Sequence, residues 1–243
     1  MLCAELTFED DLEINTYPED LINLRIANQT LFLSKLFCKF DQLCESNQVY
    51  KVRTSESNYM VIGFTGRNLK DRRDQSVLTE ETISVMKMAL EMMAVLEAEK
   101  ASSHIQSEIK KMHLKIGIHT GKVTGGIIGT RLVKYEIFGK DQLVCQMIKD
   151  SVELDSVVIS ESTMQIIQRF NVADQFVIEE GQTVTVQEKI YPTYQILKMA
   201  NVEVSESSEP SDSGSEPINS SDEQKSINTA ENESDRQSDQ ESY

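Results

Sequence analysis

The stretch Leu114–Gly139 reads LKIGIHTGKVTGGIIGTRLVKYEIFG, and it decides the fold. Its first part, Leu114–His119, alternates apolar and polar side chains, which predicts a strand. Gly125–Ile128 is apolar and flanked by glycine, and Tyr135–Phe138 predicts the returning strand of a hairpin. Close backbone approach and positive φ are open to the glycines of this stretch, namely Gly117, Gly121, Gly125, Gly126 and Gly129.

Helices and strands alternate irregularly on both sides of this stretch. Helical spacing of apolar residues predicts helices from Pro18 to about Glu45, then over Thr79–Glu99, Asp141–Lys149 and Glu161–Arg169. Alternating or short apolar runs predict strands at Met1–Leu6, Val49–Thr54, Asn58–Phe64, Ser156–Ser160, Val184–Val186 and Thr193–Leu197, and Gly66–Gln75 is expected to be a charged loop. This mixture predicts an α+β fold with a mostly antiparallel sheet.

Composition divides the chain near residue 200. The 243 residues are 39% hydrophobic and carry a formal net charge of −16. Twelve acidic and two basic residues lie in 202–243, so residues 1–201 carry only about −6, which argues against a nucleic-acid partner. We expect one domain over residues 1–200, followed by an acidic, Ser-rich, disordered tail over residues 201–243. The tail serines leave both phosphorylation and a purely solvating role open.

The four cysteines form no CxxC pair, which favours reduced thiols. No stretch approaches the roughly 18 apolar residues of a membrane helix. No signal peptide is visible either, so we expect a cytoplasmic protein without a membrane segment in this chain.

Three stretches together resemble the class III nucleotidyl cyclases, in particular the guanylyl cyclases of ciliates and apicomplexans. They are Phe40–Met60 (FDQLCESNQVYKVRTSESNYM), Leu114–Gly139, and the strand and helix start Val157–Glu161 (VVISE). The resemblance implies a ferredoxin-like class III cyclase fold with helices on one side of the sheet. It also implies cyclisation of GTP or ATP between two cyclase domains, with the glycine-rich hairpin at the dimer seam.

The resemblance further implies two Mg²⁺ or Mn²⁺ ions held by two Asp residues. Glu5 stands at the first Asp position, and its longer side chain moves the carboxylate. Ser57 stands at the second position, where a neutral hydroxyl is a poor metal ligand, and the adjacent Glu56 would face the other way on a strand. The loop Thr7–Asp11, which the resemblance places at the triphosphate, carries three carboxylates that would repel it.

The purine-contacting positions of the family correspond to Arg53 and Glu136. Their opposite charges are closer to the adenylyl than to the guanylyl pattern, and a cross-strand salt bridge is an equally good interpretation. The catalytic Asn and Arg positions hold Leu143 and Met147, which cannot position a ribose or stabilise charge. The late phosphate-binding Lys aligns with Val186, and Lys189 is nearby but out of register.

Two hypotheses follow. The chain is one half of a dimeric cyclase, weak or inactive alone, or it is a catalytically dead pseudo-cyclase that binds or regulates another cyclase domain. Because the catalytic positions are mostly replaced, we predict no measurable cyclase activity for the isolated homodimer.

Overall fold

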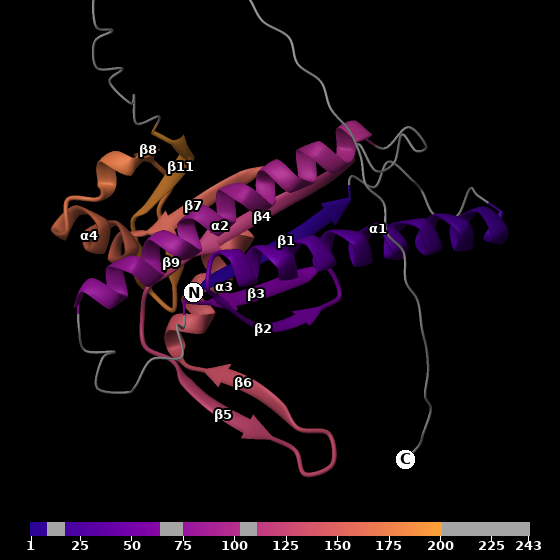
Figure 1. Ribbon diagram of the computed structural model, residues 1–243, viewed down its shortest axis with the longest axis horizontal. Helices are drawn as coiled ribbons and strands as arrows, with labels where there is room; N and C mark the ends of the chain where they lie inside the picture. The colour runs from indigo at the N-terminus through magenta and orange to yellow at the C-terminus, as the bar shows by residue number, and fades with distance from the viewer. Residues whose placement is uncertain (9–17, 64–74, 103–110, 201–243) are drawn as a thin grey trace, which may run out of the picture. The chain divides into compact units, whose positions relative to one another are not determined.

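A computed structural model describes residues 1–8, 18–63, 75–102 and 111–200 (Figure 1). The predicted charged loop at Gly66–Gln75 lies almost entirely outside these residues, as do Glu9–Asp11 of the acidic loop and the predicted disordered tail.

One seven-stranded sheet forms the centre of the fold, in the order β2-β3-β1-β4-β7-β11-β8. All neighbouring strands run antiparallel except β4 and β7, which are parallel. This confirms the α+β fold with a mostly antiparallel sheet. The strands are β1 (Leu2–Phe8), β2 (Tyr50–Ser55), β3 (Asn58–Ile62), β4 (Met112–Ile118), β7 (Ser156–Ser160), β8 (Phe176–Glu180) and β11 (Thr193–Met199).

Two hairpins stand apart from the central sheet. β5 (Thr124–Ile128) pairs with β6 (Lys134–Phe138), as the sequence predicts, and β9 (Val184–Val186) pairs with β10 (Lys189–Tyr191). The β5–β6 hairpin extends away from the helices and the sheet (Figure 1). Gly129 begins its connecting loop with φ of 95°, a conformation that glycine adopts without strain.

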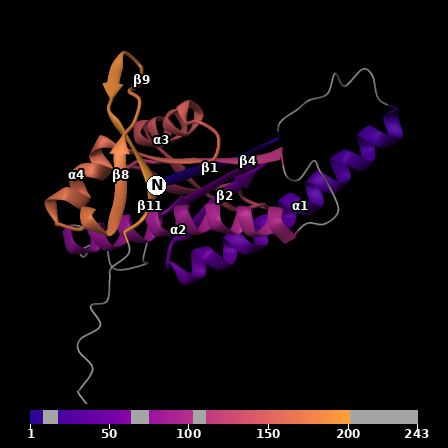
Figure 2. The same cartoon turned by 90° about the horizontal axis from the view of Figure 1, so that it is seen from above.

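Three helices pack on one face of the sheet. They are α1 (Glu19–Ser46), α2 (Gln75–Ser102) and α4 (Glu161–Arg169), and their apolar side chains join those of β1, β4 and β7 in the main core. Only the C-terminal half of α1 contributes to it, through Phe32, Leu36, Phe40 and Cys44. The N-terminal half of α1 projects past the sheet (Figure 2).

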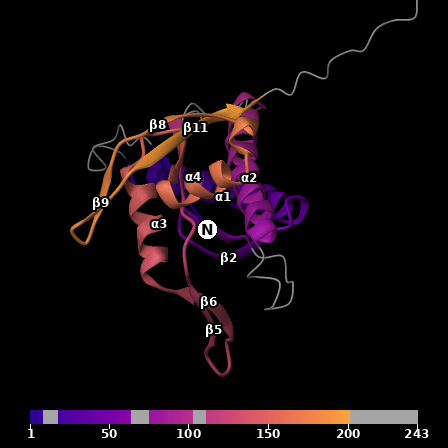
Figure 3. The same ribbon diagram turned by 90° about the vertical axis from the view of Figure 1, so that its left-hand side faces the viewer.

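Among the described residues, helix α3 (Lys140–Ser151) lies on the opposite face of the sheet (Figures 2 and 3). The expectation of helices on one side only is therefore wrong in this detail. Helix α3 has its own buried stripe, which contains Val144, Cys145 and Ile148. Gly117 of β4 lets it approach, because a Cβ built at Gly117 would lie 2.5 Å from the Lys149 backbone nitrogen. The close approach brings the C-terminal end of α3 over β1.

Candidate functional site

A cavity of about 580 Å³ opens beside α3. Residues from strand β1, the β2–β3 hairpin, strand β6 and helix α3 line it. Its charged lining residues are Lys51, Arg53, Lys134, Glu136 and Lys149. A cavity of this size with a few converging polar groups is typical of a small-molecule site.

Arg53 and Glu136, the two predicted base-contacting residues, meet at this cavity. The Nη1 atom of Arg53 lies 3.1 Å from Oε2 of Glu136, with both side chains partly exposed. Tyr50 and Tyr135 pack edge to face nearby, with ring centroids 5.8 Å apart. The structure therefore brings the pair together as a salt bridge between β2 and β6.

Glu5, the candidate for the first metal position, already binds a cation. Its Oε2 atom accepts a hydrogen bond from Lys149 Nζ at 2.7 Å. The same ammonium lies 2.6 Å from Asp150 Oδ1 and donates to Asn58 Oδ1 at 3.3 Å. Burial alone lowers the pKa of Lys149, but the hydrogen bonds with Asp150 and Glu5 outweigh it and raise the pKa above its ordinary value. Lys149 is therefore a charged, buried residue at neutral pH.

Ser57, the candidate for the second metal position, lies in the turn between β2 and β3. Its carbonyl oxygen accepts a hydrogen bond from the Leu6 backbone N–H at 3.0 Å. Glu56, beside it, adopts a left-handed φ of 54° and is exposed. The residue of this hairpin that lies opposite Glu5 in the sheet register is instead Asn58.

The residues present do not fit the divalent metal that the resemblance implies. The Glu5 carboxylate is paired with an ammonium, and Ser57 offers only a neutral hydroxyl. Within residues 1–8, 18–63, 75–102 and 111–200, no three His, Cys, Asp or Glu side chains gather as metal ligands.

The remaining predicted positions lie apart from the cavity lining. Leu143 is exposed on α3, and Met147 packs beside the apolar cluster between α3 and β7. Val186 is fully buried in that cluster, whereas the Lys189 ammonium lies 4.9 Å from the Tyr191 ring centroid. None of these four residues is among those that line the cavity.

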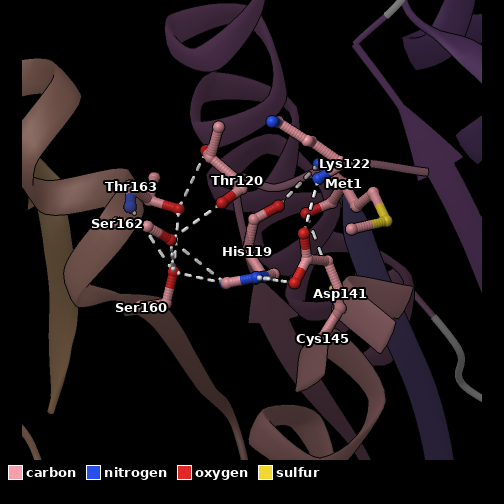
Figure 4. Close-up of polar contacts among 9 residues, drawn as sticks. All are labelled: Met1, His119, Thr120, Lys122, Asp141, Cys145, Ser160, Ser162 and Thr163. Carbon is pink, nitrogen blue, oxygen red and sulfur yellow. Dashed lines mark hydrogen bonds and ion pairs between the residues drawn. The ribbon is translucent and has the colours of Figure 1, made fainter. Parts of the chain in front are cut away.

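A network around His119 anchors the β5–β6 hairpin (Figure 4). His119 Nδ1 lies 2.8 Å from Ser160 Oγ, and its Nε2 lies 3.7 Å from Asp141 Oδ1. Asp141 also accepts a hydrogen bond from the Lys122 backbone N–H at 2.5 Å, so the two ends of the hairpin are tied together. Ser160 is fully buried and accepts a hydrogen bond from the Thr163 N–H as the N-cap of α4. The arrangement therefore serves as a structural anchor.

The hairpin itself presents apolar side chains to solvent. Leu132 is 86% exposed, Ile127 74% and Val133 61%. Contiguous exposed apolar side chains of this kind are typical of interaction surfaces.

Sequence reasoning did not identify Lys149 and Asn58. One signal was present: Lys149 follows the buried Cys145 by four residues and so belongs to the buried face of α3. A charged residue at such a position needs a buried partner. The partner itself could not be read from the sequence, because Glu5 lies 144 residues away.

Residues 21–198 match the model of the adenylate and guanylate cyclase catalytic domain. The chain belongs to this family. The cyclase domain matches the membrane guanylyl cyclase of Dictyostelium discoideum with 23% identity over 166 residues, 68% of this chain and 10% of that protein. It matches the receptor-type guanylate cyclase gcy-13 of Caenorhabditis elegans with 33% identity over 133 residues, 54% of this chain and 12% of that protein. The matched region therefore spans about a tenth of these relatives.

Solved cyclase structures have the same fold. The guanylate cyclase domain of RhGC from Catenaria anguillulae in complex with GTP gives a TM-score of 0.59 at 18% identity, covering 82% of this chain and 95% of that one. The adenylyl cyclase CyaB from P. aeruginosa gives 0.60 at 16% identity, covering 81% and 92%. A non-canonical dimeric guanylyl cyclase domain of the RhoGC fusion protein from the aquatic fungus Blastocladiella emersonii gives 0.58 at 18% identity, covering 82% and 95%.

None of the helices in the described part of this cyclase domain is long and apolar enough to cross a membrane.

Proposed function

We propose that this cyclase domain works as one half of a dimeric adenylyl or guanylyl cyclase and has little or no activity alone. The observation that carries the proposal is the exposed apolar surface of the β5–β6 hairpin, defined here by Ile127, Leu132 and Val133. Burial of these side chains against a second cyclase domain would remove apolar area from water and so favour association. The neighbours include a non-canonical dimer of the RhoGC guanylyl cyclase domain as well as monomeric structures of that domain, so the exposed hairpin carries the choice of partner.

The oligomeric state tests this proposal. Sedimentation velocity at about 10 μM detects a dimer of micromolar affinity. We expect the native chain to dimerise with itself or with a complementary cyclase half, and we expect Leu132→Asp to remain monomeric. Leu197→Asp on β11 is the matched control, because Leu197 is also exposed but lies outside the hairpin. A monomer that binds no cyclase half, or a Leu132→Asp variant that associates normally, contradicts the proposal.

A second candidate is the catalytically dead pseudo-cyclase that binds or regulates a partner domain. The Glu5–Lys149 ion pair favours it, since the family's first metal position is already neutralised. Leu143 and Met147 at the catalytic positions favour it too. A cyclase assay on the complex with a partner distinguishes the two candidates. Activity that falls with Arg53→Ala in this chain supports a shared active site, whereas unchanged activity supports a regulatory role.

We also propose a contact between the Arg53–Glu136 pair and the purine ring of GTP or ATP. Support comes from their position on the cavity wall beside Tyr50 and Tyr135. Calorimetric titration with each nucleotide tests the contact, with Arg53→Ala expected to weaken the preferred one. Equal binding by Arg53→Ala and the native chain would contradict it.

We propose further that the cyclase domain ends near residue 200, that residues 201–243 form a disordered tail, and that the protein is cytoplasmic. The end of the family match at residue 198 and the end of β11 at Met199 support the boundary. The four free cysteines support a reducing compartment. Limited proteolysis is expected to cut first after residue 200, and early cuts inside residues 111–200 would contradict the boundary.

A further inference from the structure

Three oxygen atoms surround the Lys149 ammonium beside the cavity. They are Oε2 of Glu5 at 2.7 Å, Oδ1 of Asp150 at 2.6 Å and Oδ1 of Asn58 at 3.3 Å. We call Glu5, Asp150 and Asn58 the oxygen cage. An ammonium has three N–H donors, and the cage supplies one acceptor for each. Only 4% of the Lys149 side chain is exposed, so the ammonium fills the cage.

The three oxygen ligands of the cage are of the kind that bind a divalent metal ion. Carboxylate and amide oxygens are the ligands that hard divalent cations such as Mg²⁺ and Mn²⁺ take in proteins. Two carboxylates and one amide oxygen converge here on a single point, and that point holds a side chain. Glu5 is also the residue at the family's first metal position.

We infer that the Lys149 ammonium takes the place of a divalent cation in this cage and excludes Mg²⁺ and Mn²⁺ from it. The inference rests on the proposed function only in that Glu5 corresponds to the metal position of the family. In the native protein the cation in the cage is the Lys149 ammonium itself. It joins α3 to β1 and β3 whatever the concentration of metal ions in solution.

Two features of the fold keep the ammonium in place. Gly117 allows the α3 backbone to lie against β4 at Lys149, which places the side chain over β1. The neighbouring Cys145 and Ile148 are fully buried and fix this face of α3 against the sheet. A divalent ion would have to shed water and also displace a tethered cation, and Mg²⁺ dehydrates reluctantly.

Removal of the Lys149 side chain tests the inference directly. Mn²⁺ binding is measured by electron paramagnetic resonance on the full chain, for the native protein, Lys149→Ala, Lys149→Arg and Lys100→Ala. Lys100 is the matched control because it is mostly buried and pairs with Glu97 at 2.7 Å and Asp155 at 4.0 Å. We expect Lys149→Ala alone to bind Mn²⁺, with a Kd of about 10⁻³ M or tighter, as weak natural oxygen sites do.

The three other proteins in the series show how much Mn²⁺ binds while a side-chain cation still occupies the cage. The native chain, Lys149→Arg and Lys100→Ala are expected to bind Mn²⁺ at least about tenfold more weakly than Lys149→Ala, because each keeps a side-chain cation that pairs with the two cage carboxylates and so withholds them from a metal ion. Mn²⁺ binding by the native chain as tight as that of Lys149→Ala overturns the inference. An absence of any gain in Lys149→Ala overturns it equally.

Thermal unfolding covers the case in which Lys149→Ala folds poorly. A cation that binds only the folded state raises Tm by mass action. We expect about 10 mM Mn²⁺ to raise the Tm of Lys149→Ala, or to restore its folding, without a matching rise for the native chain. A variant that stays unfolded or shows no shift at this concentration shows that the cage does not accept a cation.

The same samples separate this inference from the proposed function. Sedimentation reports whether the domain dimerises, and the difference in Mn²⁺ binding between Lys149→Ala and the native chain reports on the cage. A chain that neither dimerises nor binds a cyclase half, but whose Lys149→Ala variant gains Mn²⁺ binding, refutes the dimer proposal and leaves this inference standing. A chain that dimerises, but whose Lys149→Ala variant gains no Mn²⁺ binding, supports the dimer proposal and overturns this inference.

Discussion

The Lys149 ammonium lies 2.7 Å from the Glu5 carboxylate, although 144 residues separate them in the chain. The contact joins the end of α3 to the centre of the sheet. It also occupies the carboxylate that the resemblance to the family would place at the first metal position.

Loss of this contact is expected to destabilise the fold. Lys149→Ala leaves Glu5 partly buried without its counter-ion, and removal of one member of a buried pair costs about 3 kcal/mol of unfolding free energy. Lys100→Ala, in which the partner Glu97 is well exposed, is expected to cost about 1 kcal/mol or less. Urea unfolding at pH 7 measures both, and equal losses would argue against a special role for Lys149.

The pH dependence of the pair follows from the raised pKa of Lys149, in which the Asp150 and Glu5 contacts outweigh the lowering by burial. A folded-state pKa above the unfolded one stabilises the protein below the unfolded pKa. The stabilisation is lost as the pH rises through the folded value. We expect the stability difference between the native chain and Lys149→Ala to hold near pH 8 and to shrink above about pH 10.5. A difference that grows with alkaline pH would contradict this.

Gly117 and Gly126 offer a matched pair of substitutions. A Cβ at Gly117 would meet the Lys149 backbone, whereas a Cβ at Gly126 has open space around it. Gly117→Ala is therefore expected to lower the unfolding free energy by about 2 kcal/mol or more, as overpacking does. Gly126→Ala should change it by less than about 0.5 kcal/mol. Chemical denaturation measures the unfolding free energy of both variants. An unchanged value for Gly117→Ala would show that α3 does not depend on this close approach.

Glu99 joins α2 to α1. It is buried and accepts hydrogen bonds from Lys35 and Lys39, which lower its pKa despite the opposing effect of burial. The stabilisation is present above the unfolded pKa and is lost as the pH falls through the folded one. Glu99→Gln should lower stability at pH 7 by about 2 kcal/mol. Glu97→Gln is the exposed control, and equal effects would contradict the assignment.

Protonation of His119 in acid is expected to destabilise the folded protein. Burial lowers its pKa and outweighs the attraction of Asp141. The unfolded chain therefore binds the proton more readily, and stability falls as the pH drops below about 6.5. An NMR titration of the imidazole should give a midpoint below that of an unperturbed histidine. A midpoint above it would show that Asp141 controls the residue instead.

Local patterns were enough to predict most of the elements. The strands at Ser156–Ser160 and Val184–Val186 and the helix Glu161–Arg169 have the predicted bounds, because apolar periodicity and an N-cap serine act within a few residues. Strand β8 was missed. Its residues, Phe176–Glu180, lie on the edge of the sheet and lack a clean alternation of buried and exposed side chains.

The candidate site was predictable only in part. The Arg53–Glu136 pair followed from the resemblance, and the structure brings the two side chains together. The oxygen cage was not predictable, because Glu5, Asn58 and Asp150 come from three distant segments that only the folded sheet assembles. The position of α3 was predicted wrongly for the same reason, since the face a helix covers depends on packing such as that at Gly117.

A cyclase assay tests the central claim most directly. The purified chain, at a concentration where it is dimeric, is incubated with Mn²⁺ and either GTP or ATP, and cyclic nucleotide is quantified. We predict no product above the level of a protein-free blank. The Glu5 carboxylate is paired with Lys149, and Leu143 and Met147 stand where the resemblance to the family would place the catalytic Asn and Arg. Clear Mn²⁺-dependent formation of cyclic GMP or cyclic AMP by the isolated chain would contradict this account.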